Sequence, residues 1–389
     1  MLSCRLLIAF ILFFPVLFSG CNSPRRVAAE TIAKDKVPDD IPHSREANDT
    51  ARFLAGLPGT AGSPYAALEA TAAWKEHSRQ VDAMWHEAEG QLLPGLRKFQ
   101  ADELSDPSLE SRTVFYPFSG PDALTATLYF PHNPLYVMVA LEPAGTLPTP
   151  GQIGKKELPG YLSAIRDTMA SELGRSFFIT RQMDHQFRGQ VTDGLLTPIL
   201  QLLVRTGHTV LGFRYMRLDE GGQIIERAVT YKAPTRYGNK GVEIEYRTDA
   251  DSSLHHLLYF SVNISNDRLR ENTPFQLYLS RLTGAVSMLK ATSYMPHQPG
   301  FSMIREALLR DSEAILQDDS GLPFKDFAKD QWNVQLYGDY TRPYGSFRWE
   351  EQPDLREAYK TTGPKPLPVH VGYGYRRITS NLQLATRRK

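Results

Sequence analysis

Hydrophobic positions divide the chain into a helical first part and a longer second part in which strands alternate with helices. Over residues 65–104, apolar residues recur at helical spacing with charged residues between them. This pattern predicts a long N-terminal helix. Pro94 should interrupt it, because proline lacks an amide donor and clashes with the preceding turn. The residues expected in its core stripe are Leu68, Trp74, Val81, Trp85, Leu92, Leu96 and Phe99.

The alternating part begins with a predicted strand at 113–116, a helix at 123–130 and a strand at 135–141. The last of these is a continuous apolar run, which is typical of a strand buried on both faces of a parallel sheet. Strands separated by helices indicate right-handed crossover units. The further elements expected are helices over 161–173, 195–205 and 302–317, and strands over 176–180, 209–216, 242–247, 257–264 and 285–293.

The C-terminal stretch is rich in aromatic residues and glycine, and it predicts strands at 333–340, 344–349 and 369–376. These strands form either an antiparallel extension or a small subdomain. The expected fold class is therefore α/β: a Rossmann-like three-layer sheet with a long N-terminal helix and a β-rich C-terminal extension. We divide the body into a Rossmann-like region over 51–220 and a mixed α/β continuation or subdomain over 221–389.

An apolar run of 13 residues, 6–18, follows Arg5 near the start of the chain. It is too short to span a bilayer, which takes roughly 20 helical residues, but it suits the apolar core of a signal peptide. The run ends in Leu17-Phe18-Ser19-Gly20-Cys21, which resembles the lipobox of bacterial lipoproteins, with Phe18 where Leu is usual. The alternatives are an uncleaved N-terminal anchor helix and ordinary signal cleavage without lipidation.

The lipobox resemblance implies a signal peptide over 1–20 and, over 21–50, a lipidated Cys21 followed by a flexible tether. The end-to-end distance of this tether as a flexible coil is on the order of 30 Å. The expected partner is then the membrane, through lipid (palmitate among its chains) on Cys21. The protein would belong to the bacterial cell envelope. Asn22, where Asp is the inner-membrane retention signal, favours the outer membrane facing the periplasm.

Composition restricts the chemistry of the mature body. Cys4 leaves with the signal and Cys21 carries lipid, so no cysteine remains for a disulfide, a thiolate nucleophile or a zinc site. The formal net charge of +1 argues against general nucleic-acid binding, which requires a basic excess. With 41% hydrophobic and 22% charged residues, the body is ordinary globular material.

The most informative motif is the turn that contains Ser119, Gly120 and Asp122, followed by a strand that ends at Glu142. In a nucleotide-type Rossmann unit the first turn faces a ligand, and an acid after the second strand binds ribose hydroxyls. The layout resembles the first motif of class I methyltransferases. That resemblance implies a ligand site at these four residues and S-adenosylmethionine as the ligand.

The motif also departs from that family, and a plainer interpretation stands beside the resemblance. Gly120 is the only glycine of the turn, and Pro121 removes an amide donor. An exported protein also meets little S-adenosylmethionine, which is made in the cytoplasm. In the plainer interpretation Gly120 forms a tight turn, Asp122 caps the next helix and Glu142 is an exposed strand end.

Three other groups are candidates for chemistry. Asp318 and Asp319, expected at a helix end, suit a cation or an acid/base pair, or simply a turn. Asp184 and His185 follow a predicted strand and offer a possible base or ligand. Arg342 lies among aromatic residues that suit stacking on sugars, or ordinary packing; these are Tyr337, Tyr340, Tyr344, Phe347 and Trp349.

The sequence leaves the biochemical role open. The segments Tyr-Pro-Phe-Ser-Gly-Pro-Asp and Leu-Gln-Asp-Asp-Ser-Gly resemble uncharacterised bacterial secreted proteins, a resemblance that carries no activity. We expect ligand or partner binding, or envelope assembly. The alternatives are an envelope enzyme, hydrolytic or metal-dependent, and a degenerate methyltransferase-like protein. No cofactor, metal, catalytic residue, or protein or glycan partner is assigned.

Overall fold

The structure is a computed structural model that describes residues 43–147, 149–153, 157–176, 194–228 and 239–388. These residues belong to one compact unit. The leader, Cys21, Asp184 and His185 lie outside the described residues, as does nearly all of the strand predicted at 176–180. Among the described residues, no helix combines the length and the apolar composition needed to cross a bilayer.

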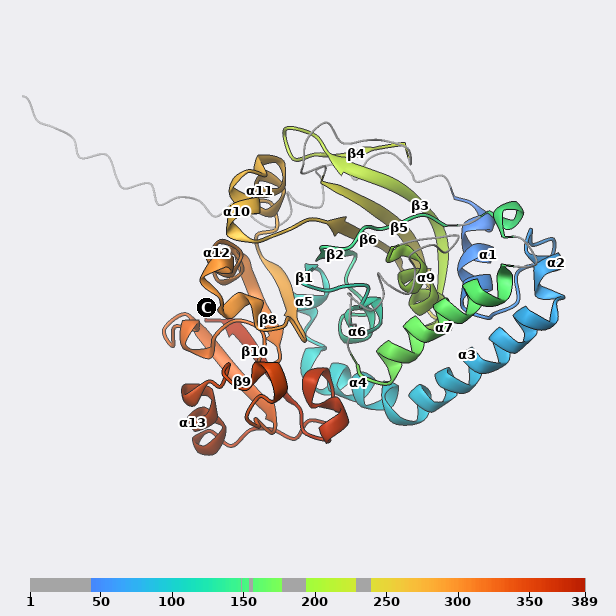
Figure 1. Ribbon diagram of the computed structural model, residues 1–389. Coiled ribbons are helices and arrows are strands. Elements are labelled where there is room, and N and C mark those ends of the chain that lie inside the picture. Colours follow the sequence, from blue (N-terminus) through green and yellow to red (C-terminus); the bar gives the residue numbers. More distant parts are fainter. Residues whose placement is uncertain (1–42, 148, 154–156, 177–193, 229–238, 389) are drawn as a thin grey trace, which may run out of the picture. The chain divides into compact units, whose positions relative to one another are not determined.

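A mixed sheet of ten strands forms the centre of the fold, in the order β4-β3-β5-β6-β2-β1-β7-β8-β10-β9 (Figure 1). The five middle strands, from β6 to β8, are parallel to one another. At both ends the sheet continues with antiparallel pairs. The strands are β1 (Thr113–Pro117), β2 (Leu135–Ala140), β3 (His208–Leu218), β4 (Ile224–Glu226), β5 (Lys240–Thr248), β6 (Leu254–Ser261), β7 (Ala285–Leu289), β8 (Ser312–Gln317), β9 (Trp332–Gly338) and β10 (Asn381–Arg387).

Two apolar cores hold helices against the sheet, because side chains alternate along each strand. Tyr116 and Met138 belong to the first core, and their neighbours Phe115 and Val137 to the second. The first core contains residues of α1 (Arg45–Leu54), α3 (Ala72–Gln91), α4 (Leu93–Phe99), α6 (Ala123–Tyr129), α7 (Leu158–Leu173) and α9 (Leu196–Arg205). The second contains residues of α10 (Asn266–Arg270), α11 (Thr273–Leu279) and α12 (Ser302–Asp311).

The long helical pattern at 65–104 is divided into several helices. These are α2 (Ala66–Glu69), α3, α4 and the π-helical η2 (Gln100–Leu104). The division between α3 and α4 falls at Leu92, and Pro94 lies in the first turn of α4, where its missing amide does no harm. All seven residues of the predicted core stripe are buried, so that prediction is confirmed.

The predicted helix at 302–317 is wrong in its second half. The helix α12 ends at Asp311, and residues 312–317 form β8, a parallel strand inside the sheet. Ala314, Ile315 and Leu316 alternate between the two cores. Because both faces of β8 are buried, its sequence lacks the polar alternation that marks an exposed strand.

The C-terminal predictions are partly wrong. Residues 344–349 and 369–376 contain the 3₁₀ turns η7 (Gly345–Phe347) and η8 (Gly372–Arg377) instead of strands, and β10 was not predicted. The extension is nevertheless antiparallel, and it belongs to the main sheet. The sheet also spans the boundary predicted at residue 220, because β3 lies before that residue and pairs with β5, which lies after it. The remaining short elements are α5 (Pro107–Glu110), η3 (Pro150–Gln152), η4 (Met295–His297), η5 (Pro299–Phe301), η6 (Phe324–Asp326) and α13 (Pro353–Thr361).

The last residues of the expected tether are helical. Ser44 caps α1 by accepting a hydrogen bond from the amide of Glu46, and Ala47 and Thr50 are buried. The folded body therefore begins several residues before residue 51.

Candidate functional site

A cavity of about 130 Å³ lies where β1, β2, β6 and β7 end. These four strands are parallel, so their carboxyl ends meet at one edge of the sheet. That edge is where open α/β sheets hold their ligands. Residues of all four strand ends line the cavity: Ser119, Gly120 and Asp122 after β1, Leu141 and Glu142 after β2, Val262, Asn263 and Ile264 after β6, and Lys290 to Ser293 after β7.

The turn between β1 and α6 is held in a conformation that few residues adopt. Phe118 and Gly120 have φ angles of 61° and 54°, and for Phe118 this left-handed backbone is strained. The amide of Ser119 donates to the carbonyl of Val139 at 3.1 Å, which joins the turn to β2. Strain of this kind persists where the surroundings fix the backbone, as they do here.

Asp122 closes the turn by capping α6. Its Oδ1 atom accepts a hydrogen bond from the amide of Thr125 at 3.0 Å, so the capping interpretation is confirmed. Its Oδ2 atom accepts a second bond from the hydroxyl of Tyr116 at 2.9 Å. Burial, together with the Asp122 charge, raises the pKa of Tyr116 well above its ordinary value, so this hydroxyl remains a donor.

Lys290, at the end of β7, forms a buried ion pair with Asp122. Its Nζ atom lies 2.7 Å from Oδ2 of Asp122 and donates to Oγ1 of Thr125 at 2.7 Å. Burial alone lowers the pKa of Lys290, but the carboxylates of Asp122 and Glu172 outweigh it, so the net direction is upward. Lys290 is therefore a cation that compensates the charge of Asp122.

Glu172, from the last turn of α7, is the third ionisable group of this cluster. One carboxyl oxygen lies 3.9 Å from Nζ of Lys290, and neither oxygen has a hydrogen-bond partner among the described residues. Burial, and then the like charge of Asp122, raise the pKa of Glu172 to about 8. The buried position therefore favours the protonated form of Glu172.

Glu142, which follows β2, also lines the cavity. It is half-buried, and its backbone carbonyl accepts a 2.6 Å bond from the hydroxyl of Tyr259, which fixes the chain at the end of β2. No hydrogen bond or ion pair joins its side chain to another described residue. Around it lie the apolar side chains of Phe118, Leu141, Val262, Ile264, Met295 and Phe301.

The loop after β7 forms another wall of the cavity and is strained in the same way as the first turn. Ala291, Ser293 and Tyr294 have φ angles of 52°, 57° and 54°. Hydrogen bonds from neighbouring segments fix this backbone. The amide of Thr292 donates to Oγ of Ser320 at 2.9 Å, and the amide of Ser293 to the hydroxyl of Tyr373 at 2.9 Å.

Asp318 and Asp319 support this loop and do not line the cavity. They follow β8, not a helix, and both are buried. Asp318 accepts from the amides of Ala291 at 2.8 Å and Ser320 at 3.0 Å. Burial, and then the charge of Asp319, raise the pKa of Asp318 to about 7.

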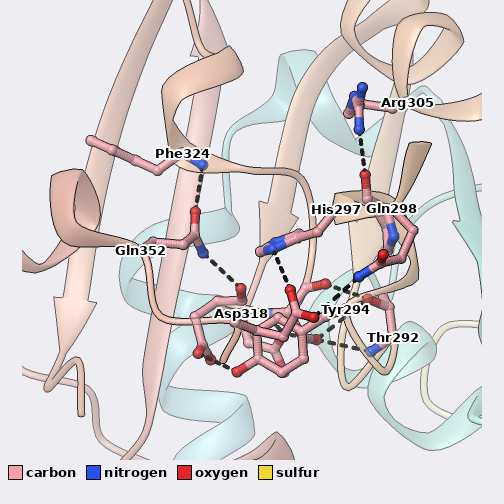
Figure 2. Close-up of polar contacts among 12 residues, drawn as sticks. Thr292, Tyr294, His297, Gln298, Arg305, Asp318, Phe324 and Gln352 are labelled. Carbon is pink, nitrogen blue, oxygen red and sulfur yellow. Dashed lines mark hydrogen bonds and ion pairs between the residues drawn. The ribbon is translucent and has the colours of Figure 1, made fainter. Parts of the chain in front are cut away.

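Asp319 joins the same loop to the C-terminal segments; Figure 2 shows Tyr294 and Gln352, two of the residues that contact it. Its carboxylate accepts from the hydroxyl of Tyr294 at 2.6 Å and from the side-chain amide of Asn381 at 3.0 Å. The side-chain amide of Gln352 donates to the backbone carbonyl of Asp319. The side-chain oxygen of Gln352 accepts from the backbone amide of Phe324. Among the described residues, no group of three or more His, Cys, Asp or Glu side chains is placed to hold a metal ion.

Four of the predicted ligand residues thus meet at one cavity: Ser119, Gly120, Asp122 and Glu142. Comparisons of the chain with protein families, with curated proteins and with solved structures find no match.

Sequence analysis missed Lys290, Glu172 and the residues after β6. A signal for Lys290 was present, because it is a single lysine inside the mainly apolar strand predicted at 285–293. Glu172 gave no such signal, since a glutamate near a helix end is ordinary on an exposed surface. Only the tertiary packing, which buries Glu172 and places it 3.9 Å from Lys290, makes it a buried acid.

Proposed function

We propose that this chain is a lipid-anchored protein of the bacterial envelope whose body binds a small nucleoside-type ligand at the carboxyl edge of its parallel strands. The observation that carries the proposal is the cavity that the β1 turn and Glu142 line together. Apolar side chains suit a flat ring, and a carboxylate that has no partner among the described residues suits a pair of ring hydroxyls.

The sheet supports a Rossmann-like, three-layer interpretation. Numbered along the chain, the parallel strands β1, β2, β6, β7 and β8 lie in the order 3-2-1-4-5, the order of the doubly wound fold. The two apolar cores correspond to helical layers on opposite faces of this sheet. From β1 the chain extends the sheet on one side through β2 and β6, and it then returns to the other side of β1 with β7. Such a switch point is where this fold binds ligands.

The end of the sheet also resembles class I methyltransferases, in which an antiparallel last strand is inserted beside the parallel ones. Here β10 lies between β8 and β9 and is antiparallel to both. The turn departs from that family, since Pro121 has no amide to donate and the paired Asp122 and Lys290 side chains fill the space beside it. We therefore propose binding of a nucleoside-type ligand, not methyl transfer.

A thermal-shift experiment tests the ligand class, because a ligand that binds only the native state raises the melting temperature. Adenosine should raise it, and 2′,3′-dideoxyadenosine, which lacks both ring hydroxyls, should raise it much less. Equal shifts with the two compounds contradict hydroxyl recognition. A much larger shift with S-adenosylmethionine would instead favour the methyltransferase-like alternative.

The anchor has a separate test. The lipobox residues Leu17 to Cys21 support lipidation, and two or more acyl chains hold a protein stably on a bilayer, whereas one holds it weakly. Cys21→Ala should abolish labelling by radioactive palmitate and release the protein from the membrane fraction. Unchanged labelling of this variant contradicts the assignment.

A further inference from the structure

Three of the six large apolar side chains that are exposed among the described residues lie in two C-terminal turns. Tyr344, Trp349 and Ile378 are 48%, 75% and 72% exposed. The first two flank η7, and Ile378 directly follows η8. Singly exposed apolar residues are ordinary, but a group of them marks a surface that contacts something else.

The two turns contact each other through Tyr344, so their exposed side chains lie in one region of the surface. The guanidinium of Arg377 lies 4.5 Å from the ring centre of Tyr344, and the hydroxyl of Tyr344 donates to the carbonyl of Tyr373 at 3.2 Å. Beneath them, the rings of Phe347 and Tyr373 pack at 5.0 Å. We name this surface the C-terminal patch and define it as Tyr344, Arg348, Trp349, Arg377 and Ile378.

The C-terminal patch is cationic. Arg348 lies 4.7 Å from the ring centre of Trp349, and Arg377 lies over Tyr344. Neither arginine forms an ion pair with a carboxylate of the described residues, whereas nearby Arg342 does, with Glu351 at 3.2 Å. The patch therefore presents two uncompensated positive charges beside exposed aromatic rings.

Ile378 is exposed at a cost to the backbone. Its φ angle is 56°, a left-handed conformation that is a genuine outlier for a β-branched residue. The turn is fixed by hydrogen bonds from the amide of Ile378 to Tyr375 and from the amide of Thr379 to Gly374. A strained residue that holds an aliphatic side chain in solvent suggests a functional contact.

From this surface we infer that the C-terminal patch docks the folded body onto the headgroup region of an anionic phospholipid bilayer. Tryptophan and tyrosine favour the boundary between water and hydrocarbon, and arginine can bury its stem while its charge reaches a phosphate. Anionic lipids attract such cationic groups. An aliphatic tip such as Ile378 gains from contact with acyl chains but gains little from a polar glycan. The inference rests on the proposed anchor, which would keep a bilayer within reach.

Tryptophan fluorescence gives a direct test, because Trp349 is the exposed tryptophan of the chain, while Trp74, Trp85 and Trp332 are only 6%, 5% and 3% exposed. The lipidated full-length mature protein is reconstituted into vesicles of brominated phosphatidylglycerol and, in parallel, of brominated phosphatidylcholine. Bromine quenches a tryptophan that enters the lipid. We expect quenching in phosphatidylglycerol that is much weaker in phosphatidylcholine and falls with added salt.

Variants identify the source of the quenching. Trp349→Phe should abolish it, and the double variant Arg348→Gln/Arg377→Gln should lose most of it. Arg342→Gln, which removes a paired arginine nearby, is the matched control and should keep it. Equal emission from brominated and unbrominated phosphatidylglycerol vesicles overturns the inference, as does a change in Trp349 emission caused by soluble glycan fragments but not by vesicles. Palmitate labelling of the same preparation separates this failure from failure of the anchor.

Discussion

The Nζ atom of Lys290 lies 2.7 Å from Oδ2 of Asp122, and this ion pair is buried beneath the ligand cavity. The two residues come from the ends of β7 and β1, which are adjacent in the sheet although far apart in the chain. The pair therefore joins the two strand ends between which the chain changes direction. It makes the base of the cavity a fixed polar surface.

Breaking this pair should be costly. Asp122→Asn removes the carboxylate nearest Lys290 and leaves only Glu172, 3.9 Å away, to compensate its charge. Removing one partner of a buried ion pair typically costs about 3–5 kcal/mol of the free energy of unfolding. Urea denaturation measures this change in the free energy of unfolding. The double variant Asp122→Asn/Lys290→Met should lose clearly less than the sum of the two single variants. Additive losses, or a loss below about 1 kcal/mol for Asp122→Asn, in which the asparagine oxygen can still cap α6, would contradict the coupling.

Glu172 should make stability depend on pH. Its pKa is raised to about 8 in the folded protein, so between its unfolded pKa, about 4.3, and 8 the folded state binds more protons than the unfolded state. The stabilisation is fully present below the unfolded pKa and is lost as the pH rises through 8. Glu172→Gln cannot ionise, so this variant should gain stability relative to the parent, by a few kcal/mol, from pH 5 to pH 9.

A matched control makes the pH measurement specific. Glu357 is exposed in α13, so the stability difference between Glu357→Gln and the parent should stay constant over the same range. The pKa of Asp318 is also raised, but Asp318 is present in every protein compared, so its contribution to the pH dependence cancels. A flat difference for Glu172→Gln would show that Glu172 is ionised in the fold.

Much of the β1–α6–β2 unit was predictable, whereas the site it forms was predictable only in part. The sequence shows that Asp122 follows a strand and precedes a helix. In the structure Asp122 caps that helix and also forms an ion pair with Lys290. The partner, Lys290, lies at the end of a strand predicted in nearly the right place. What the sequence did not reveal is strand order, and only that order places β7 beside β1.

The errors have a common physical cause. The spacing of hydrophobic and polar residues distinguishes a helix from a strand only where one face is exposed, and segments that are buried on all sides show little such spacing. No glycine or proline separates β8 from α12, so the sequence carries no turn signal between them and predicts one continuous helix. The aromatic residues at 344–349 suggested a strand, but Gly345 with a φ of 61° begins a 3₁₀ turn. Asp318 and Asp319 looked like turn residues or metal ligands, and contacts from distant segments determine their actual role.

Gly372 offers a test of that long-range support. Its φ is 61°, and a Cβ atom there would lie 2.6 Å from Oδ2 of Asp318, which is held by the loop after β7. Gly345 has the same φ but open space around it, so Gly345→Ala measures backbone strain alone. Gly372→Ala should destabilise the fold by about 1–3 kcal/mol more, from overpacking, in chemical denaturation. Equal losses would show that Asp318 moves freely.

Titration calorimetry with adenosine tests the central claim, that Glu142 holds the hydroxyls of a ligand in the cavity. The proteins compared are the parent, Glu142→Gln and the exposed control Glu357→Gln. Hydrogen bonds to a charged group contribute about 1.5–3 kcal/mol, so Glu142→Gln should bind roughly 10- to 150-fold more weakly, and the control should match the parent. Equal affinity of Glu142→Gln and the parent, or no binding of adenosine by the parent, would contradict the account.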